Sequence, residues 1–246
     1  MIKCVIFDFG DTLVKSIHNE SVFILAYKNF LNKHHMDFSV NKIKQAHYAA
    51  AGKWKKLGHT QKTPTKFYFE KIFFSALGLS PRKELSCQLH EEYTKLQIRR
   101  TKLFPSAKCT LKKLHDKKII LCVITNTDDN TNRIIAKKKT IYKYFTHFLM
   151  SHEEGTIKSE LKIFNILLRK VNKRRKDKIH PNECLMVGNN LNEDTAASKL
   201  GIKTAILTKS IEFDKKRQVF EPDYYIDNLN EIQGIIEIEN KNSDSG

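Results

Sequence analysis

Short apolar runs recur along this chain of 246 residues, and stretches with helical periodicity separate most of them. The runs are Cys4–Phe7, Ile119–Ile124, Phe148–Met150, Cys184–Val187, Thr204–Leu207 and, more weakly, Tyr224–Ile226. Runs of this length are typical of buried strands, and strands that alternate with helices form a parallel sheet covered on both faces. We therefore predict an α/β fold built on a parallel sheet.

The interval between the first two runs departs from this alternation, because it is long and almost wholly helical. Apolar residues recur there at spacings of three and four in Ser21–Lys33, Val40–Leu57, Pro64–Leu77 and Pro81–Arg99. We predict a core formed by residues 1–15 and 104–246, with an inserted helical module at residues 16–103. The polar tail from Glu237 onward is expected to fray.

Composition excludes several classes of protein. Hydrophobic residues make up 40% of the chain, and no apolar run approaches the roughly 20 residues that span a bilayer. A strand starts at Cys4 with no leader segment before it, so we predict a cytoplasmic location. The five cysteines lack CxxC spacing, and three of them lie in or beside apolar runs. This arrangement favours buried, reduced thiols.

The formal net charge of +17 raises the hypothesis of a nucleic-acid partner. However, the basic residues are 36 lysines and only 8 arginines, spread over the whole length. Proteins that read bases and phosphates favour arginine, whose fork matches those groups. The charge pattern therefore favours a lysine-rich surface, and such a surface also draws anionic substrates toward a cleft.

Polar side chains follow four of the predicted strands. Asp8 comes directly after the first strand, Thr125-Asn126 after the second, Lys158 in the loop beyond the third, and Asp194 shortly after the fourth. In an open parallel sheet, ligands bind beyond the carboxyl ends of the strands. The set suits a phosphoryl group that Thr and Lys hold and Asp attacks, with a hard cation between the carboxylates.

These segments resemble the four motifs of the haloacid dehalogenase-like superfamily, in the same order and with suitable spacing. The matching segments are Phe7–Leu13 (FDFGDTL), Thr125-Asn126, Lys158 ahead of Ile163-Phe164, and Met186–Ser198 (MVGNNLNEDTAAS). The resemblance covers nearly the full length. It implies a Rossmann-like core, and it implies that residues 16–103 form a cap of the C1 type.

The resemblance also implies an activity, the Mg²⁺-dependent hydrolysis of a small phosphomonoester through an aspartyl-phosphate intermediate. In that reaction Asp8 would be the nucleophile. Thr125, Asn126 and Lys158 would bind the transferring group, and Lys158 would also offset charge among the carboxylates. The expected partner is therefore a small phosphorylated metabolite.

The expected magnesium ligands are one oxygen of Asp8, the backbone carbonyl of Gly10, Asn189 and Asp194. A carboxylate that attacks a dianionic phosphate needs a metal and a lysine to screen the repulsion. The family commonly has Asp at the position of Asn189. An amide oxygen brings less charge, so we predict weaker affinity for Mg²⁺.

A second departure from the family pattern lies beside the nucleophile. Phosphatases of the family usually carry a second Asp two residues after it, as general acid and base, but this chain has Gly10 there and Asp11 next. Either Asp11 substitutes, or a water or substrate group supplies the proton. General acid–base help contributes roughly 10²–10⁴-fold, so its loss would leave a slow enzyme.

Other interpretations stay open for single residues and for the whole chain. Asp8 and Asp11 could be turn residues, and Asp194 could cap a helix over Thr195–Leu200. One alternative function is a 2-haloacid dehalogenase, which uses an Asp nucleophile without metal. Another is a catalytically weakened scaffold that binds an anionic partner such as nucleic acid.

Overall fold

The computed structural model describes residues 1–15, 20–57, 68–127, 129–212 and 220–244. The chain forms two compact units, one of residues 1–16 and 102–246 and the other of residues 17–101. The boundaries predicted from the sequence, after residue 15 and before residue 104, lie within two residues of this division. Among the helices described, none is both long and apolar enough to cross a membrane.

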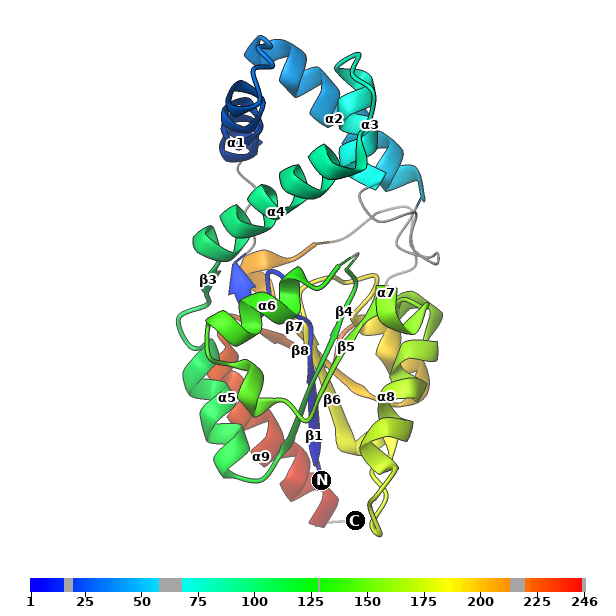
Figure 1. The fold of residues 1–246 in the computed structure, drawn as a ribbon. Helices are drawn as coiled ribbons and strands as arrows, with labels where there is room; N and C mark the ends of the chain where they lie inside the picture. The colour runs from blue at the N-terminus through cyan, green and yellow to red at the C-terminus, as the bar shows by residue number, and fades with distance from the viewer. Residues whose placement is uncertain (16–19, 58–67, 128, 213–219, 245–246) are drawn as a thin grey trace. The chain divides into compact units, whose positions relative to one another are not determined.

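The larger unit is built on a six-stranded sheet with the order β5-β4-β1-β6-β7-β8 (Figure 1). All neighbouring strands in it are parallel. The strands are β1 (Cys4–Phe7), β4 (Ile120–Thr125), β5 (His147–Met150), β6 (Cys184–Gly188), β7 (Lys203–Leu207) and β8 (Tyr224–Ile226). The prediction of an α/β parallel sheet is confirmed.

The chain enters this sheet in the middle, at β1, whose four residues are all buried. A continuous apolar run is what a strand needs when helices cover both of its faces. The chain then adds β4 and β5 on one side of β1 and returns to add β6, β7 and β8 on the other. Such a reversal opens a crevice at the carboxyl ends of the central strands, where ligands bind in folds of this kind.

Helices cover the two faces of the sheet, with α5 and α9 on one side and α8 on the other (Figure 1). Three buried side chains of α8, Ile163, Phe164 and Leu167, share a core with residues of β1, β4 and β6. The helices of this unit are α5 (Ala107–Asp116), α6 (Thr131–Lys138), α7 (Ser151–Glu154), α8 (Lys162–Asn172) and α9 (Ile232–Asp244). Short 3₁₀ turns are η1 (Tyr142–Tyr144), η2 (Lys158–Glu160), η3 (Pro181–Glu183), η4 (Thr195–Leu200), η5 (Thr208–Ser210) and η6 (Leu229–Glu231).

The smaller unit consists of four helices among its described residues, α1 (Glu20–Lys33), α2 (Val40–Leu57), α3 (Tyr68–Ala76) and α4 (Lys83–Arg100). They bury a core of their own that is rich in aromatic side chains, including Phe23, Tyr27, Phe30, Phe73 and Phe74. The apolar residues whose spacing predicts these helices therefore form this core. The predicted start of the third helix, Pro64, lies outside the described residues.

A short antiparallel ribbon lies where the chain leaves and re-enters the larger unit. It pairs β2 (Val14–Lys15) with β3 (Lys102–Leu103). The amide of Phe104 also donates to the carbonyl of Leu13. The ribbon closes the insertion directly after the predicted nucleophile segment. That segment is therefore held between β1 on one side and the ribbon on the other.

The carboxyl-terminal tail differs from the sequence-based expectation. Instead of fraying from Glu237, the chain continues as α9 to Asp244. Ile232, Ile235 and Ile236 are buried, and the Asn240 side chain accepts a hydrogen bond from the backbone N–H of Ile2. The buried isoleucines anchor the helix just before this tail, and within the tail Asn240 links it to the start of the chain.

Candidate active site

Three predicted site residues meet at the carboxyl edge of the sheet. The Nζ of Lys158 donates to Oδ1 of Asp8 at 2.8 Å and to Oδ1 of Asp194 at 2.6 Å. Asp8 directly follows β1, Asp194 follows β6, and Lys158 begins η2 beyond β5 and α7. The lysine therefore joins carboxylates delivered by two neighbouring strands.

This trio is almost completely withdrawn from solvent. Lys158 is 2% exposed, Asp194 is 0% exposed and Asp8 is 7% exposed. Burial raises the pKa of Asp8 to about 7, and the neighbouring Asp194 adds to this rise while Lys158 opposes it. Burial also disfavours the charge of Lys158, but Asp194 and Asp8 outweigh that effect and hold the pKa of the ammonium above its usual range. When both carboxylates are ionised, the dry site carries one negative charge more than Lys158 neutralises.

The turn after β6 folds the Asp194 side chain back toward the strand end. Its Oδ2 accepts the backbone N–H groups of Asn189 at 3.0 Å and Asn190 at 2.9 Å. Only glycine fits at position 188, because a Cβ atom there would lie 2.0 Å from Oδ2 of Asp194. Although Asp194 precedes η4, its side chain makes no capping hydrogen bond to that turn. Its carboxylate instead accepts hydrogen bonds from Lys158 and from the backbone N–H groups of Asn189 and Asn190.

Asn189 links three segments around the nucleophile. Its Oδ1 accepts a hydrogen bond from the buried hydroxyl of Thr12 at 3.1 Å, and its Nδ2 donates to the carbonyl of Ser210 at 2.8 Å. The hydroxyl of Ser210 donates in turn to the carbonyl of Asp11. One lone pair of the Asn189 amide oxygen is therefore engaged by Thr12, and the second remains for another partner.

Gly10 and Asp11 lie in the tight turn that follows the nucleophile. Gly10 bridges to Val14, and the N–H of Asp11 donates to the carbonyl of Val14 at 2.7 Å. Asp11 has a φ of 52°, in the left-handed region that Asp tolerates better than most residues. Both residues are half-buried, so this turn keeps them at the edge of the site.

Thr125 is the last residue of β4 and lies beside the nucleophile strand. Phe7 and Val123 are partners in the register, which places Thr125 two residues further toward the carboxyl edge. The hydroxyl of Thr125 accepts a hydrogen bond from Nδ2 of Asn132 at 3.1 Å. Because that amide nitrogen only donates, the Thr125 hydroxyl keeps its own hydrogen for another acceptor.

Asn126 contacts protein groups with both ends of its amide. Its Oδ1 accepts the backbone N–H of Lys158 at 3.2 Å, and its Nδ2 donates to Oε2 of Glu193 at 2.6 Å. The loops after β4, β5 and β6 are thereby connected at one side chain.

The sequence interpretation missed four residues that support the site: Thr12, Asn132, Glu193 and Ser210. Thr12 and Glu193 lie inside the segments quoted as motifs, so closer attention to their polar side chains could have found them. Nothing in the local pattern around Asn132 or Ser210 distinguishes them from ordinary polar residues of a helix or turn.

The donor set suits a small hard cation. Among the described residues, no group of three or more His, Cys, Asp or Glu side chains is arranged to hold a metal. Mg²⁺ does not need one, since it commonly binds one or two carboxylates and completes its shell with carbonyls and water. Asp8 and Asp194 supply two carboxylates that share one ammonium, and their excess negative charge favours a cation.

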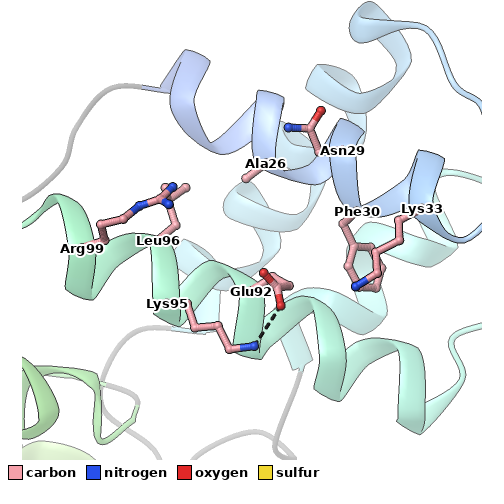
Figure 2. Close-up of a pocket in the computed structure, with 8 residues that line it drawn as sticks. All are labelled: Ala26, Asn29, Phe30, Lys33, Glu92, Lys95, Leu96 and Arg99. Carbon is pink, nitrogen blue, oxygen red and sulfur yellow. Dashed lines mark hydrogen bonds and ion pairs between the residues drawn. The ribbon is translucent and has the colours of Figure 1, made fainter.

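A separate groove of about 380 Å³ lies between α1 and α4 of the smaller unit (Figure 2). Its lining contains none of the residues predicted for the site. Lys33, Lys95 and Arg99 line it with positive charge, while Ala26, Phe30 and Leu96 are apolar. Glu92 and Lys95 form an ion pair across 2.9 Å. The groove thus combines apolar and cationic lining, without the paired carboxylates that the sheet edge offers.

The fold and the site together define an α/β protein with a buried carboxylate–lysine–carboxylate cluster where the strand order reverses. The model of one family, described as haloacid dehalogenase-like hydrolase, matches residues 2–201. The chain belongs to this family.

Similar proteins of known sequence include two from Vibrio. A phosphoglycolate phosphatase of Vibrio vulnificus (strain CMCP6) is 28% identical over 134 residues, which are 54% of this chain and 56% of that protein. One of Vibrio parahaemolyticus is 26% identical over 136 residues, 55% of this chain and 57% of the other. The chain therefore spans about half the length of the curated relatives it matches.

Solved structures resemble the whole fold. The magnesium-bound HAD-hydrolase YfnB of Bacillus subtilis has a TM-score of 0.66 at 17% identity, covering 96% of this chain and 99% of that one. A 2-haloacid dehalogenase of Pseudomonas syringae has a TM-score of 0.72 at 19% identity, with coverage of 96% and 99%. At these identities the likeness shows a shared fold.

Proposed function

We propose that this protein is a Mg²⁺-dependent phosphatase that hydrolyses a small phosphomonoester through an aspartyl-phosphate on Asp8. The observation that carries the proposal is the buried contact of one lysine, Lys158, with carboxylates from two adjacent strand ends. The phosphoglycolate phosphatases among the relatives support a small phosphorylated substrate.

In the first step, an oxygen of Asp8 attacks phosphorus, a new phosphorus–oxygen bond forms and the bond to the leaving alcohol breaks. Lys158 neutralises charge beside the nucleophile and opposes the rise in the pKa of Asp8, which favours the reactive carboxylate. The Thr125 hydroxyl donates to an oxygen of the transferring group, since Asn132 donates to the hydroxyl oxygen and leaves its hydrogen available. Asn126 maintains the loop of Lys158 through the backbone N–H of that residue.

In the second step, water attacks the phosphorus of the acyl phosphate, inorganic phosphate leaves and the Asp8 carboxylate is restored. A proton must reach the leaving alcohol in the first step and leave the attacking water in the second. Asp11 is the carboxylate nearest in sequence to the nucleophile that can carry both transfers. Gly10, at the position where the family's phosphatases usually have Asp, supplies no proton, so without the Asp11 carboxylate a slow reaction is expected.

The residues that would hold Mg²⁺ are Asp8, Asp194, the carbonyl of Gly10 and the amide oxygen of Asn189. When bound, the ion screens the repulsion between the Asp8 carboxylate and the anionic phosphoryl group. Asn189 already accepts a hydrogen bond from Thr12 and carries no charge, so the affinity for Mg²⁺ should be modest.

The test is a screen of phosphorylated metabolites and a generic aryl phosphate with Mg²⁺, in which released phosphate is measured. Asp8→Asn should lower kcat/KM by at least about 10³-fold, because it removes the nucleophile. Asp116→Asn is the matched control: it makes the same change at an exposed residue paired with Lys112, and full activity is expected.

Three outcomes would contradict the proposal. Equal turnover by the wild type and Asp8→Asn would mean that another group is the nucleophile. Chloride release from 2-haloacids without metal, in place of phosphate release, would indicate the dehalogenase alternative. Neither activity, together with binding to DNA or RNA that weakens steeply with salt, would indicate an anion-binding scaffold.

A further inference from the structure

The turn between β6 and η4 holds Glu193 in a defined backbone position. The side-chain oxygen of Asn190 accepts the backbone N–H groups of Asn192 at 3.0 Å and Glu193 at 3.1 Å. The N–H of Asp194 donates to the carbonyl of Asn190 at 2.9 Å. Because three consecutive amides are fixed by one residue, the Glu193 side chain leaves the turn in a set direction.

The carboxylate of Glu193 accepts a hydrogen bond from Nδ2 of Asn126 across 2.6 Å. This is a charge-assisted hydrogen bond of short length, the kind that is stronger than a bond between neutral groups. It joins residues that lie 67 positions apart, on loops that follow strands β4 and β6. Glu193 is only half-buried, but it is aimed at the site edge of the sheet.

The partners of Asn126 determine which way its amide points. On one side is Lys158, whose backbone N–H needs an acceptor, and on the other is Glu193, whose carboxylate needs a donor. Turning the amide over would place its NH₂ against the Lys158 N–H and its oxygen against the Glu193 carboxylate. Both contacts would then be repulsive, so Glu193 selects the orientation in which Asn126 holds Lys158.

We propose that Glu193 is a positioning residue of the site: its carboxylate orients Asn126, which anchors the backbone at Lys158 and keeps that ammonium between Asp8 and Asp194. The inference rests on the proposed phosphatase function and adds a residue to it. Glu193 acts through Asn126 by accepting a hydrogen bond, so a neutral acceptor at position 193 should position Asn126 nearly as well.

Isosteric variants separate the hydrogen bond from the charge. Glu193→Gln keeps an oxygen that accepts from Asn126, so kcat should stay within about threefold of the wild type. Asn126→Asp removes the donor and places a new carboxylate opposite that of Glu193. The two repel each other, so kcat should fall by about tenfold or more. In the double variant Asn126→Asp with Glu193→Gln, the glutamine NH₂ donates to the new carboxylate at position 126 in place of the original bond, and activity should recover.

The matched control is Glu160→Gln, which removes the same charge from a carboxylate that accepts the Thr156 hydroxyl at 2.7 Å on the same loop as Lys158. It should leave kcat unchanged. A loss in Glu193→Gln as large as the loss in Asn126→Asp would overturn the proposal, because charge would then be the essential property. Failure of the double variant to recover above Asn126→Asp would overturn it as well.

A second measurement does not depend on activity. Hydrogen exchange of the peptide that contains the Lys158 amide should be about tenfold faster in Asn126→Asp than in the wild type, and it should slow again in the double variant. If the wild type releases no phosphate from any substrate, the phosphatase proposal fails, while the exchange pattern still decides whether Glu193 and Asn126 hold Lys158. Identical exchange in all three proteins would overturn the positioning role.

Discussion

At the scale of single residues, hydrogen-bond direction decides what a polar side chain can offer a ligand. Asn132 donates to the oxygen of Thr125, so the hydroxyl hydrogen of Thr125 remains for the transferring group. Asn132 lies on α6, the next helix after β4, and Thr125 is 3% exposed. A neighbour of identical shape but opposite hydrogen-bonding character would redirect that hydroxyl.

We predict that Asn132→Asp weakens the binding of the phosphoryl group. The new carboxylate accepts the Thr125 hydroxyl, turns its hydrogen away from the ligand and adds a negative charge near an anion. The inhibition constant for inorganic phosphate should rise about tenfold, because the bound phosphate loses the hydrogen bond from Thr125. The measurement is the phosphate inhibition constant of the purified variant.

Asn130→Asp controls for the added charge, because it makes the same substitution at an exposed residue two positions away. Only a modest change is expected from it. Equal inhibition constants in the two variants would show that Thr125 does not depend on Asn132 for its orientation.

At the scale of elements, the edge strand β8 is short and is held to β7 by a side chain that precedes it. Oδ2 of Asp223 accepts the backbone N–H of Thr204 at 2.8 Å and its hydroxyl at 3.0 Å, while Oδ1 pairs with Lys203 at 3.1 Å. Partial burial opposes the charge of Asp223, but these donors outweigh it and lower the pKa of the carboxyl below its ordinary value.

We predict that Asp223→Asn destabilises the protein by about 1 kcal/mol at neutral pH, a modest value because the edge is partly exposed to solvent. A carboxyl whose pKa is lower in the folded state stabilises that state above its ordinary pKa of about 3.9, and this contribution disappears as the pH falls through the folded value. Urea unfolding of both proteins at pH 7 and near pH 3 measures it. The difference should shrink in acid; a constant or growing difference would contradict the assignment.

At the scale of the whole molecule, the net charge of +17 sets the long-range field. A field of this sign attracts an anionic substrate before any contact forms and raises the association rate. Salt shortens the reach of the field, from about 30 Å at 0.01 M to about 10 Å at 0.1 M ionic strength. Charge spread over many lysines can thus serve a small anionic substrate as well as a large polyanion.

We therefore predict that kcat/KM for a phosphomonoester decreases as ionic strength rises from about 0.01 M to about 0.1 M, while kcat changes little. The measurement is steady-state phosphate release at saturating Mg²⁺, with two salts of different anions to separate screening from a specific ion effect. A value of kcat/KM that is independent of salt would mean that the surface charge plays no part in substrate capture.

The sequence by itself determined the sheet, the helical insertion and the order of the polar residues at the strand ends. Each of these follows from residues that are neighbours in the sequence. Four consecutive apolar residues make a buried strand, and a polar residue directly after it lies at the strand's carboxyl end. Asp8 and Thr125 can be placed in this way from the sequence alone. Their proposed roles rest on that placement and on the resemblance of the motifs.

Only the tertiary structure decided which polar groups meet. Lys158 pairs with carboxylates 150 and 36 positions away, and Thr12 pairs with Asn189 across 177 positions. Such pairs leave no periodic pattern, because their geometry depends on how strands from distant parts of the chain lie side by side. The same reason applies to α9: the polar residues from Glu237 onward indicate a frayed end, whereas the helix continues to Asp244 from a start that the buried Ile232, Ile235 and Ile236 anchor.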